Sequence, residues 1–131
     1  MYGVVTRNAE EVRWPEFERG FYEVKDVTGR SSDPIADGVN MVSCFGDNAA
    51  ADADPSLMPV DDMGRPADRQ QPYFDWAYIC PSREDYREGL FEVIDDCVAE
   101  NEDVRLDDIG FPRAEYCHCG VCEQAFEASE F

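Results

Sequence analysis

A long amphipathic helix between two apolar strands limits what this chain can fold into. Residues 82–100 carry apolar side chains three and four positions apart, and Ser82 with Asp85 forms a capping-box pattern at the start of the helix. Residues 39–45 before it and residues 104–109 after it have the composition of strands. Strand, helix and strand in this order predict a βαβ unit with parallel strands and a right-handed crossover. The predicted fold class is therefore α/β.

The rest of the chain is less regular, and its length makes a single domain the default. With 131 residues, 44% of them apolar, the chain can build one modest core. Residues 1–38 have a weak pattern, in which alternation over residues 21–27 predicts one short edge strand. Residues 49–71 are rich in Asp, Pro and small side chains and are predicted to form a long acidic loop. Residues 123–131 are predicted to be helical.

Acidic residues dominate the charge of the chain. Its 30 Asp and Glu outnumber its 11 Lys and Arg, which gives a formal net charge of -19. Ten of the eleven basic residues are Arg, and Lys25 is the only Lys. Nucleic acid and anionic membranes are not expected as partners, because binding to phosphates needs a surplus of basic side chains. The pattern resembles haloarchaeal cytosolic proteins, whose carboxylate shell keeps molecules apart in molar salt.

The start of the chain and its hydropathy predict a cytoplasmic protein. Residues 1–10 lack the basic and apolar regions of a signal peptide, and no apolar run approaches the roughly 18 residues of a membrane span. The lack of a signal and the close clustering of three of the six Cys favour metal binding over disulfide formation, and Cys97, on the apolar stripe of the helix, is expected to be a small core residue.

Three cysteines within six residues are the strongest local signal for chemistry. Cys117, Cys119 and Cys122 can surround one tetrahedral ion, and thiolates at this density favour zinc. The candidates for a fourth ligand are, in order of preference, Cys80, Cys44 and His118. A site with four protein ligands would stabilise the fold and leave no position for a catalytic water. Two alternatives stay open: reduced cysteines without metal, and redox chemistry at the final Cys-x-x-Cys pair.

A second set of candidates lies at the end of the strand over residues 104–109 and just before Cys80. Asp107 and Asp108 stand at the carboxyl end of that strand, which in parallel α/β sheets faces the ligand crevice. The alternative is a solvated acidic turn. Four aromatic side chains either belong to the core or line a pocket. They are Tyr73, Phe74, Trp76 and Tyr78.

Several of these motifs together resemble one section of barrel-type glycoside hydrolases. The section runs from Cys80-Pro81-Ser82 through the helix and a strand ending Leu-Asp-Asp to the cysteine cluster at 116–126. It is similar to the zinc-bearing β-galactosidases of family 42 and to related hypothetical barrel glycosidases. The resemblance implies a (β/α) barrel with a structural zinc bound by Cys80 and the three later cysteines. It also implies Asp107 or Asp108 as acid or sugar ligand, with the four aromatic side chains stacking on a pyranose.

Two departures from this family limit the implied activity. When Asp107 is aligned with the Asp of the family's Asp-Asn-Glu, Ile109 takes the place of the catalytic Glu. A closed barrel needs about 250 residues, so a chain of 131 residues is expected to be a partial barrel that is inactive alone. The expected partners are a carbohydrate and either the remainder of the barrel or further copies of the chain. The alternative is a small non-enzymatic module of a halophile, acidic and zinc-stabilised, that binds a protein.

Overall fold

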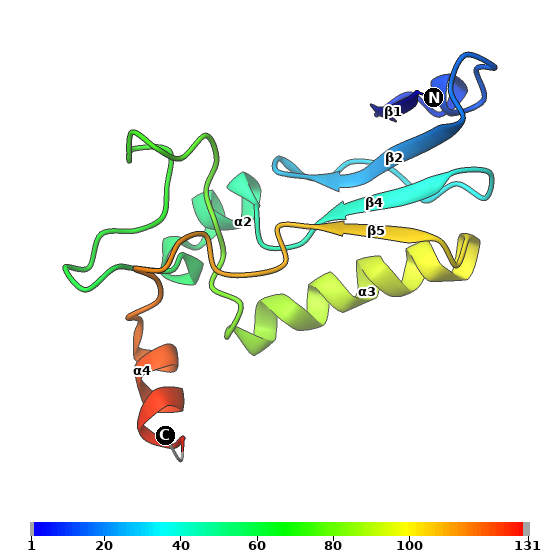
Figure 1. The fold of residues 1–131 in the computed structure, drawn as a ribbon. Helices are drawn as coiled ribbons and strands as arrows, with labels where there is room; N and C mark the ends of the chain where they lie inside the picture. Colours follow the sequence, from blue (N-terminus) through cyan, green and yellow to red (C-terminus); the bar gives the residue numbers. More distant parts are fainter. Residues whose placement is uncertain (1, 130–131) are drawn as a thin grey trace.

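The computed structural model of the chain describes residues 2–129 and contains a parallel sheet, a long helix packed along it and an irregular segment beyond the carboxyl ends of the strands (Figure 1). The strands are β1 (Gly3–Thr6), β2 (Arg19–Asp26), β3 (Gly29–Arg30), β4 (Val39–Ser43) and β5 (Val104–Asp107). The helices are α1 (Ala9–Val12), α2 (Asn48–Ala53), the 3-10 turn η1 (Pro55–Leu57), α3 (Glu84–Glu100) and α4 (Gly120–Glu127).

The strands follow one another across the sheet in the order β1-β2-β4-β5, all parallel, while the short β3 pairs antiparallel with β2. The predicted βαβ unit is confirmed, since β4 and β5 are parallel neighbours with α3 between them in the chain. The mixed α/β class is confirmed as well. A closed barrel has eight such strands, whereas the described residues form four parallel strands whose outer members, β1 and β5, each have one neighbour.

The main core lies between one face of the sheet and the helices α1 and α3. Val24 and Val42 point to this face and pack with Leu90 and Cys97 of α3. At the β1 end of the same face, a Cβ on Gly20 would lie 2.8 Å from the Cα of Val12 in α1. Only glycine permits so close an approach, and α1 therefore rests directly on β2.

The weakly patterned start and the acidic loop both contain more structure than expected. The strand expected at the sheet edge is β2, which instead lies inside the sheet between β1 and β4. The loop expected over residues 49–71 is wrong in its first part, which forms α2 and η1. Asp47 accepts a hydrogen bond from the Ala50 amide and caps a run of alanines, and Asp54 caps η1 in the same way.

The two later helices differ from the prediction at their first turns. α3 begins at Glu84 after Arg83, which provides no side-chain cap. The expected cap, Ser82, instead accepts a hydrogen bond from Cys122 Sγ at 3.3 Å. α4 begins at Gly120 and ends at Glu127, and the last two residues of the predicted helix lie outside the described part of the chain.

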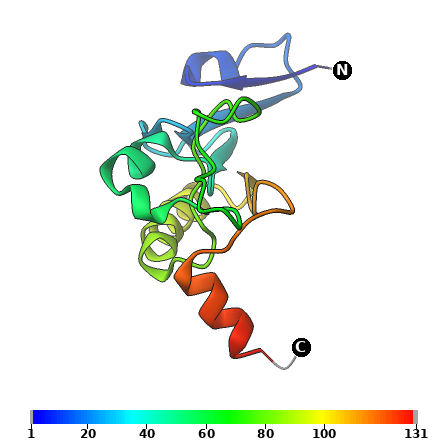
Figure 2. The same cartoon turned by 90° about the vertical axis from the view of Figure 1, so that its left-hand side faces the viewer.

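A second, smaller core joins the irregular segment to the C-terminal part of the chain. Ala67, Phe74 and Tyr116 are buried together, with Tyr78 and Cys117 packed against them. Beyond this core, α4 buries none of its residues and extends away from the sheet (Figure 2). Within residues 2–129, no helix is both long and apolar enough to cross a membrane.

Candidate functional site

Four cysteine side chains meet where the irregular segment, the start of α3 and α4 come together. The sulfur atoms of Cys80, Cys117, Cys119 and Cys122 all lie within 4.8 Å of one another. The Sγ atom of Cys80 is 3.4 Å from that of Cys122 and 3.9 Å from that of Cys119. The group that the sequence predicts is therefore brought together, with Cys80 rather than Cys44 or His118 as its fourth member.

Backbone hydrogen bonds fix the two stretches that supply these sulfurs. The Cys80 amide donates to the Leu57 carbonyl at 2.7 Å, which ties the residue to η1. The His118 amide donates to the Val60 carbonyl at 2.8 Å and holds the loop between Cys117 and Cys119 against the same segment. α4 then starts directly after Cys119, so that Cys122 turns back toward Cys80 in its first turn.

Burial and mutual proximity set the protonation of the cluster. Burial raises the pKa of the Cys117 thiol to about 11 and raises that of Cys80 further still. Burial also acts to raise the pKa of Cys119, but hydrogen bonds from the Cys122 amide and from neighbouring thiols lower it below the ordinary value. The Cys119 amide itself donates to Cys117 Sγ at 3.2 Å. Four sulfur donors in this arrangement could hold a metal ion.

The carboxyl ends of the strands form a separate pocket of about 230 Å³, here called the carboxyl-edge pocket. Its lining consists of strand-end residues and one aromatic side chain from the irregular segment: Arg7, Glu23, Lys25, Asp26, Val27, Met41, Ser43, Trp76, Asp107 and Asp108. Asp107 and Asp108, the candidate acids, thus share one pocket with Trp76.

Asp108 has an unusual backbone conformation at this edge. Its φ of 53° is the only positive value for a non-glycine residue in the described chain. Asp tolerates this region better than most residues, and such conformations concentrate at functional sites. The Ser43 hydroxyl donates to Asp108 Oδ2 at 2.8 Å, and the Phe45 amide donates to the Asp108 carbonyl at 2.9 Å. These two bonds hold the carboxylate against β4.

Polar atoms also converge on Gly46, next to this carboxylate. A Cβ on Gly46 would lie 2.8 Å from both Trp76 Nε1 and Asp108 Oδ2. The Trp76 Nε1 atom is buried and has no hydrogen-bond partner among the described residues. A buried indole donor usually finds a partner, and this one lies in the lining of the carboxyl-edge pocket.

The other aromatic candidates lie elsewhere. Phe74 is buried in the second core, and Tyr78 packs against that core with its ring 6.0 Å from Trp76. Tyr73 is half exposed, and the Arg113 guanidinium lies 4.4 Å from its ring centroid. Of the four aromatic side chains, Trp76 is the one that lines the carboxyl-edge pocket.

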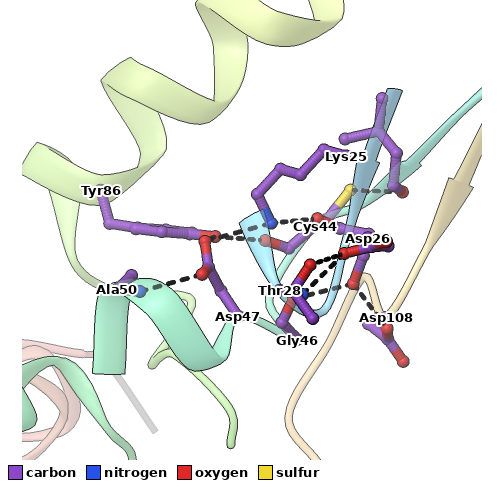
Figure 3. A network of polar contacts seen from close by, with 11 residues as sticks. Lys25, Asp26, Thr28, Cys44, Gly46, Asp47, Ala50, Tyr86 and Asp108 are labelled. Atoms are coloured by element: carbon purple, nitrogen blue, oxygen red, sulfur yellow. Dashed lines mark hydrogen bonds and ion pairs between the residues drawn. The ribbon is translucent and has the colours of Figure 1, made fainter. Parts of the chain in front are cut away.

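Sequence reasoning missed a buried polar network around Lys25, which is one of the residues that line the pocket (Figure 3). Lys25 Nζ donates to the Ser43 carbonyl at 2.6 Å and lies 3.2 Å from Asp47 Oδ2. The Tyr86 hydroxyl donates to the same carboxylate at 2.9 Å, which brings β2, β4, α2 and α3 together. Burial lowers the pKa of Lys25, and the nearby Asp47 carboxylate opposes that shift. The one available signal was that Lys25 is the only Lys in the chain.

Fold and cluster together define a mixed α/β protein with a parallel sheet and a four-cysteine group that could hold a metal ion. No family model matches the chain, and no curated protein matches it. Among solved structures, it is similar to a hypothetical protein from Ruminiclostridium thermocellum ATCC 27405, with a TM-score of 0.59 and 15% sequence identity. The match covers 88% of this chain and 80% of that one, so the two are comparable in length. This likeness shows the fold alone and gives no support for a glycoside hydrolase family.

Proposed function

We propose that the four-cysteine cluster binds one zinc ion, which stabilises the fold. The observation that carries this proposal is that four sulfur atoms lie within 4.8 Å of one another. Four thiolates form a closed tetrahedral set typical of structural zinc sites, and they disfavour hard cations such as Ca²⁺ and Mg²⁺. Since protein would supply every ligand, the ion's role is structural. It would join the segment before α3 to the start of α4.

Metal content tests the zinc proposal. We expect about one equivalent of zinc per chain in protein purified without chelator, measured by elemental analysis. Cys80→Ala should lose most of this metal. Cys97→Ala is the matched control, because Cys97 is a free thiol buried in the main core, away from the cluster. Less than half an equivalent in the wild type, or equal metal content in the two variants, would contradict the proposal.

We also propose that the chain is glycoside hydrolase-like and that its carboxyl-edge pocket binds a carbohydrate. What supports this is that Asp107, Asp108 and Trp76 line one pocket at the carboxyl ends of parallel strands, where α/β folds bind their ligands. Carboxylates accept hydrogen bonds from sugar hydroxyls, and an indole ring offers an apolar surface to a pyranose.

Binding without hydrolysis is the proposed activity of the chain alone. Glycoside hydrolysis needs two carboxyl groups on either side of the bond, one of them as acid. Asp107 and Asp108 are adjacent in the chain and come from one strand end, and Ile109 follows them where the resembling family has its Glu. The other two carboxylates of the pocket, Glu23 and Asp26 of β2, are both paired with the Arg7 guanidinium, so neither is free to act as the acid.

Calorimetric titration with a panel of neutral oligosaccharides in molar KCl tests sugar binding. We expect Asp107→Asn to weaken binding at least tenfold. Asp103→Asn is the control, because Asp103 is an exposed carboxylate at the opposite end of β5. If the wild type binds no sugar at millimolar concentrations, the sugar proposal fails and the alternative, a zinc-stabilised module that binds a protein partner, takes its place.

A further inference from the structure

One face of the sheet has no helix against it in the described part of the chain. Its members are Val5, Phe21, Glu23, Val39, Met41 and Arg105, here called the open sheet face. Val39 is buried, and Glu23 and Met41 also line the carboxyl-edge pocket. The strand register places them on one side, opposite the side chains that contact α1 and α3. Val5 is 52% exposed, and the Arg105 guanidinium lies 5.4 Å from the Phe21 ring centroid.

An uncovered face is unusual for a parallel sheet. Parallel sheets occur almost only in proteins that cover both faces. Here the sequential order β1-β2-β4-β5 keeps α1 and α3 on one face, which is the arrangement of a barrel wall rather than of a doubly wound sheet.

The two edges of the sheet are open as well, because β1 and β5 each have one neighbour. Exposed apolar side chains lie at both edges, with Tyr2 and Val5 at β1 and Leu106 at β5. Free edges and exposed apolar side chains of this kind promote pairing with another chain.

We propose that a second copy of this chain covers the open sheet face, with β5 of each copy paired to β1 of the other. Two copies bring together eight parallel strands, the number that closes a (β/α) barrel. Each copy offers two free edges, β1 and β5. A two-fold axis along the barrel would pair all four edges of two copies, so the assembly would close as a dimer. The strand count and the two matching edges thus favour a second copy over an unrelated partner.

The charges on the open sheet face allow this contact in concentrated salt. The two charged residues of this face are already paired within their own chain, Glu23 with Arg7 and Arg105 with Asp107, so the face offers apolar contact although each chain has a net charge of -19. At molar salt the Debye length is about 3 Å, which screens the long-range repulsion between copies while leaving apolar contact intact. Association should therefore strengthen as salt is added.

The assembly would also complete the carboxyl-edge pocket. In a closed parallel barrel all strands end at one mouth, so Asp107 of each copy would face that of the other across it. This consequence rests on the proposed sugar site, whereas the dimer itself does not.

Analytical ultracentrifugation of the zinc-loaded full chain in molar KCl tests the assembly. We expect a dimer of twice 14.9 kDa and at least tenfold weaker association for Val5→Glu. Val98→Glu is the matched control, since Val98 is 48% exposed on α3, away from the open sheet face, and should leave the dimer unchanged. Hydrogen exchange should show slower exchange of β1 and β5 amides in the dimer than in dilute monomer.

Each other outcome overturns the inference. A wild-type monomer at all concentrations in molar KCl rules out the second copy, and equal dimerisation of Val5→Glu and Val98→Glu rules out the open sheet face. A dimer whose β1 and β5 amides exchange as in the monomer rules out edge pairing. Zinc content and sugar titration are measured on the same samples, so a monomer that binds both would refute this inference alone.

Discussion

Replacing Lys25 with methionine is expected to lower the free energy of unfolding by about 3–5 kcal/mol, because the Asp47 carboxylate would stay buried without its cation. The side chains of Lys25 and Asp47 are 6% and 7% exposed, so water screens the pair weakly. Their charged atoms lie 3.2 Å apart. At an effective dielectric constant of about 20, two unit charges at that distance attract by about 5 kcal/mol, partly offset by the cost of removing both from water.

A double-mutant cycle isolates this ion pair. Asn at position 47 can still cap α2 and accept from the Tyr86 hydroxyl, so Asp47→Asn removes mainly the charge. Urea unfolding of Lys25→Met, Asp47→Asn and the double variant, followed by circular dichroism at pH 7 in molar KCl, should give a coupling of at least 1.5 kcal/mol. A coupling near zero, or a cost below about 1 kcal/mol for Lys25→Met, would refute this reasoning.

The same site explains why position 25 holds a Lys in a chain whose ten other basic residues are Arg. The Lys25 ammonium is a compact charge that fits between the Ser43 carbonyl and Asp47, whereas a guanidinium is a wide planar group. Lys25→Arg should therefore cost about 1–3 kcal/mol through overpacking, although it keeps the charge. Wild-type stability of Lys25→Arg in the same urea assay would show that shape does not matter here.

Three further predictions concern acid, packing and salt. Burial acts to raise the pKa of the Asp61 carboxyl, but hydrogen bonds from Met63 and Arg65 hold that pKa below 3.8. The ionised Asp61 therefore stabilises the fold above pH 3.8, and this stabilisation is lost as the pH falls through the lower folded-state pKa. Asp61→Asn should shift the urea midpoint more at pH 5 than at pH 3, unlike exposed Asp62→Asn, and an equal shift at both pH values would contradict this. Gly20→Ala should lower the free energy of unfolding by about 1–3 kcal/mol, because the new Cβ would clash with Val12. Gly89→Ala is the control and should raise the melting temperature, because Gly89 lies in α3 with open space around it. Equal effects of the two variants on stability would show that α1 does not rest on β2. The melting temperature should rise between low and molar KCl because of the net charge of -19, and a flat or falling trend would refute the halophile interpretation.

Local patterns predicted the parts of this molecule that depend on local sequence. The periodicity of residues 82–100 and the apolar runs on either side were enough for β4, α3 and β5. The cysteine spacing, with the family resemblance, was enough for the cluster, including Cys80. The alanine run after Asp47 carried a helix signal too, but the surrounding Pro and Asp residues obscured it.

The parts that sequence did not predict depend on contacts between distant segments. The Lys25 network needs β2, β4, α2 and α3 in place, and no spacing in the chain encodes it. Phe74 and Trp76 are two residues apart with similar chemistry, yet one packs in the second core and the other lines the pocket. The positive φ of Asp108 likewise depends on the path of the chain after β5, and the residue type at this position does not predict it.

The sequential strand order has a consequence for how the protein is made. Each of the four parallel strands joins the sheet next to the parallel strand that preceded it, so the sheet can grow at one edge as the chain leaves the ribosome, without inserting a strand between earlier ones. Cys80 is synthesised well before Cys117, Cys119 and Cys122, so the four-cysteine cluster cannot form until those three have been added. Because Cys117, Cys119 and Cys122 all follow β5 in the chain, capture of a metal ion would come after all the strands have been made.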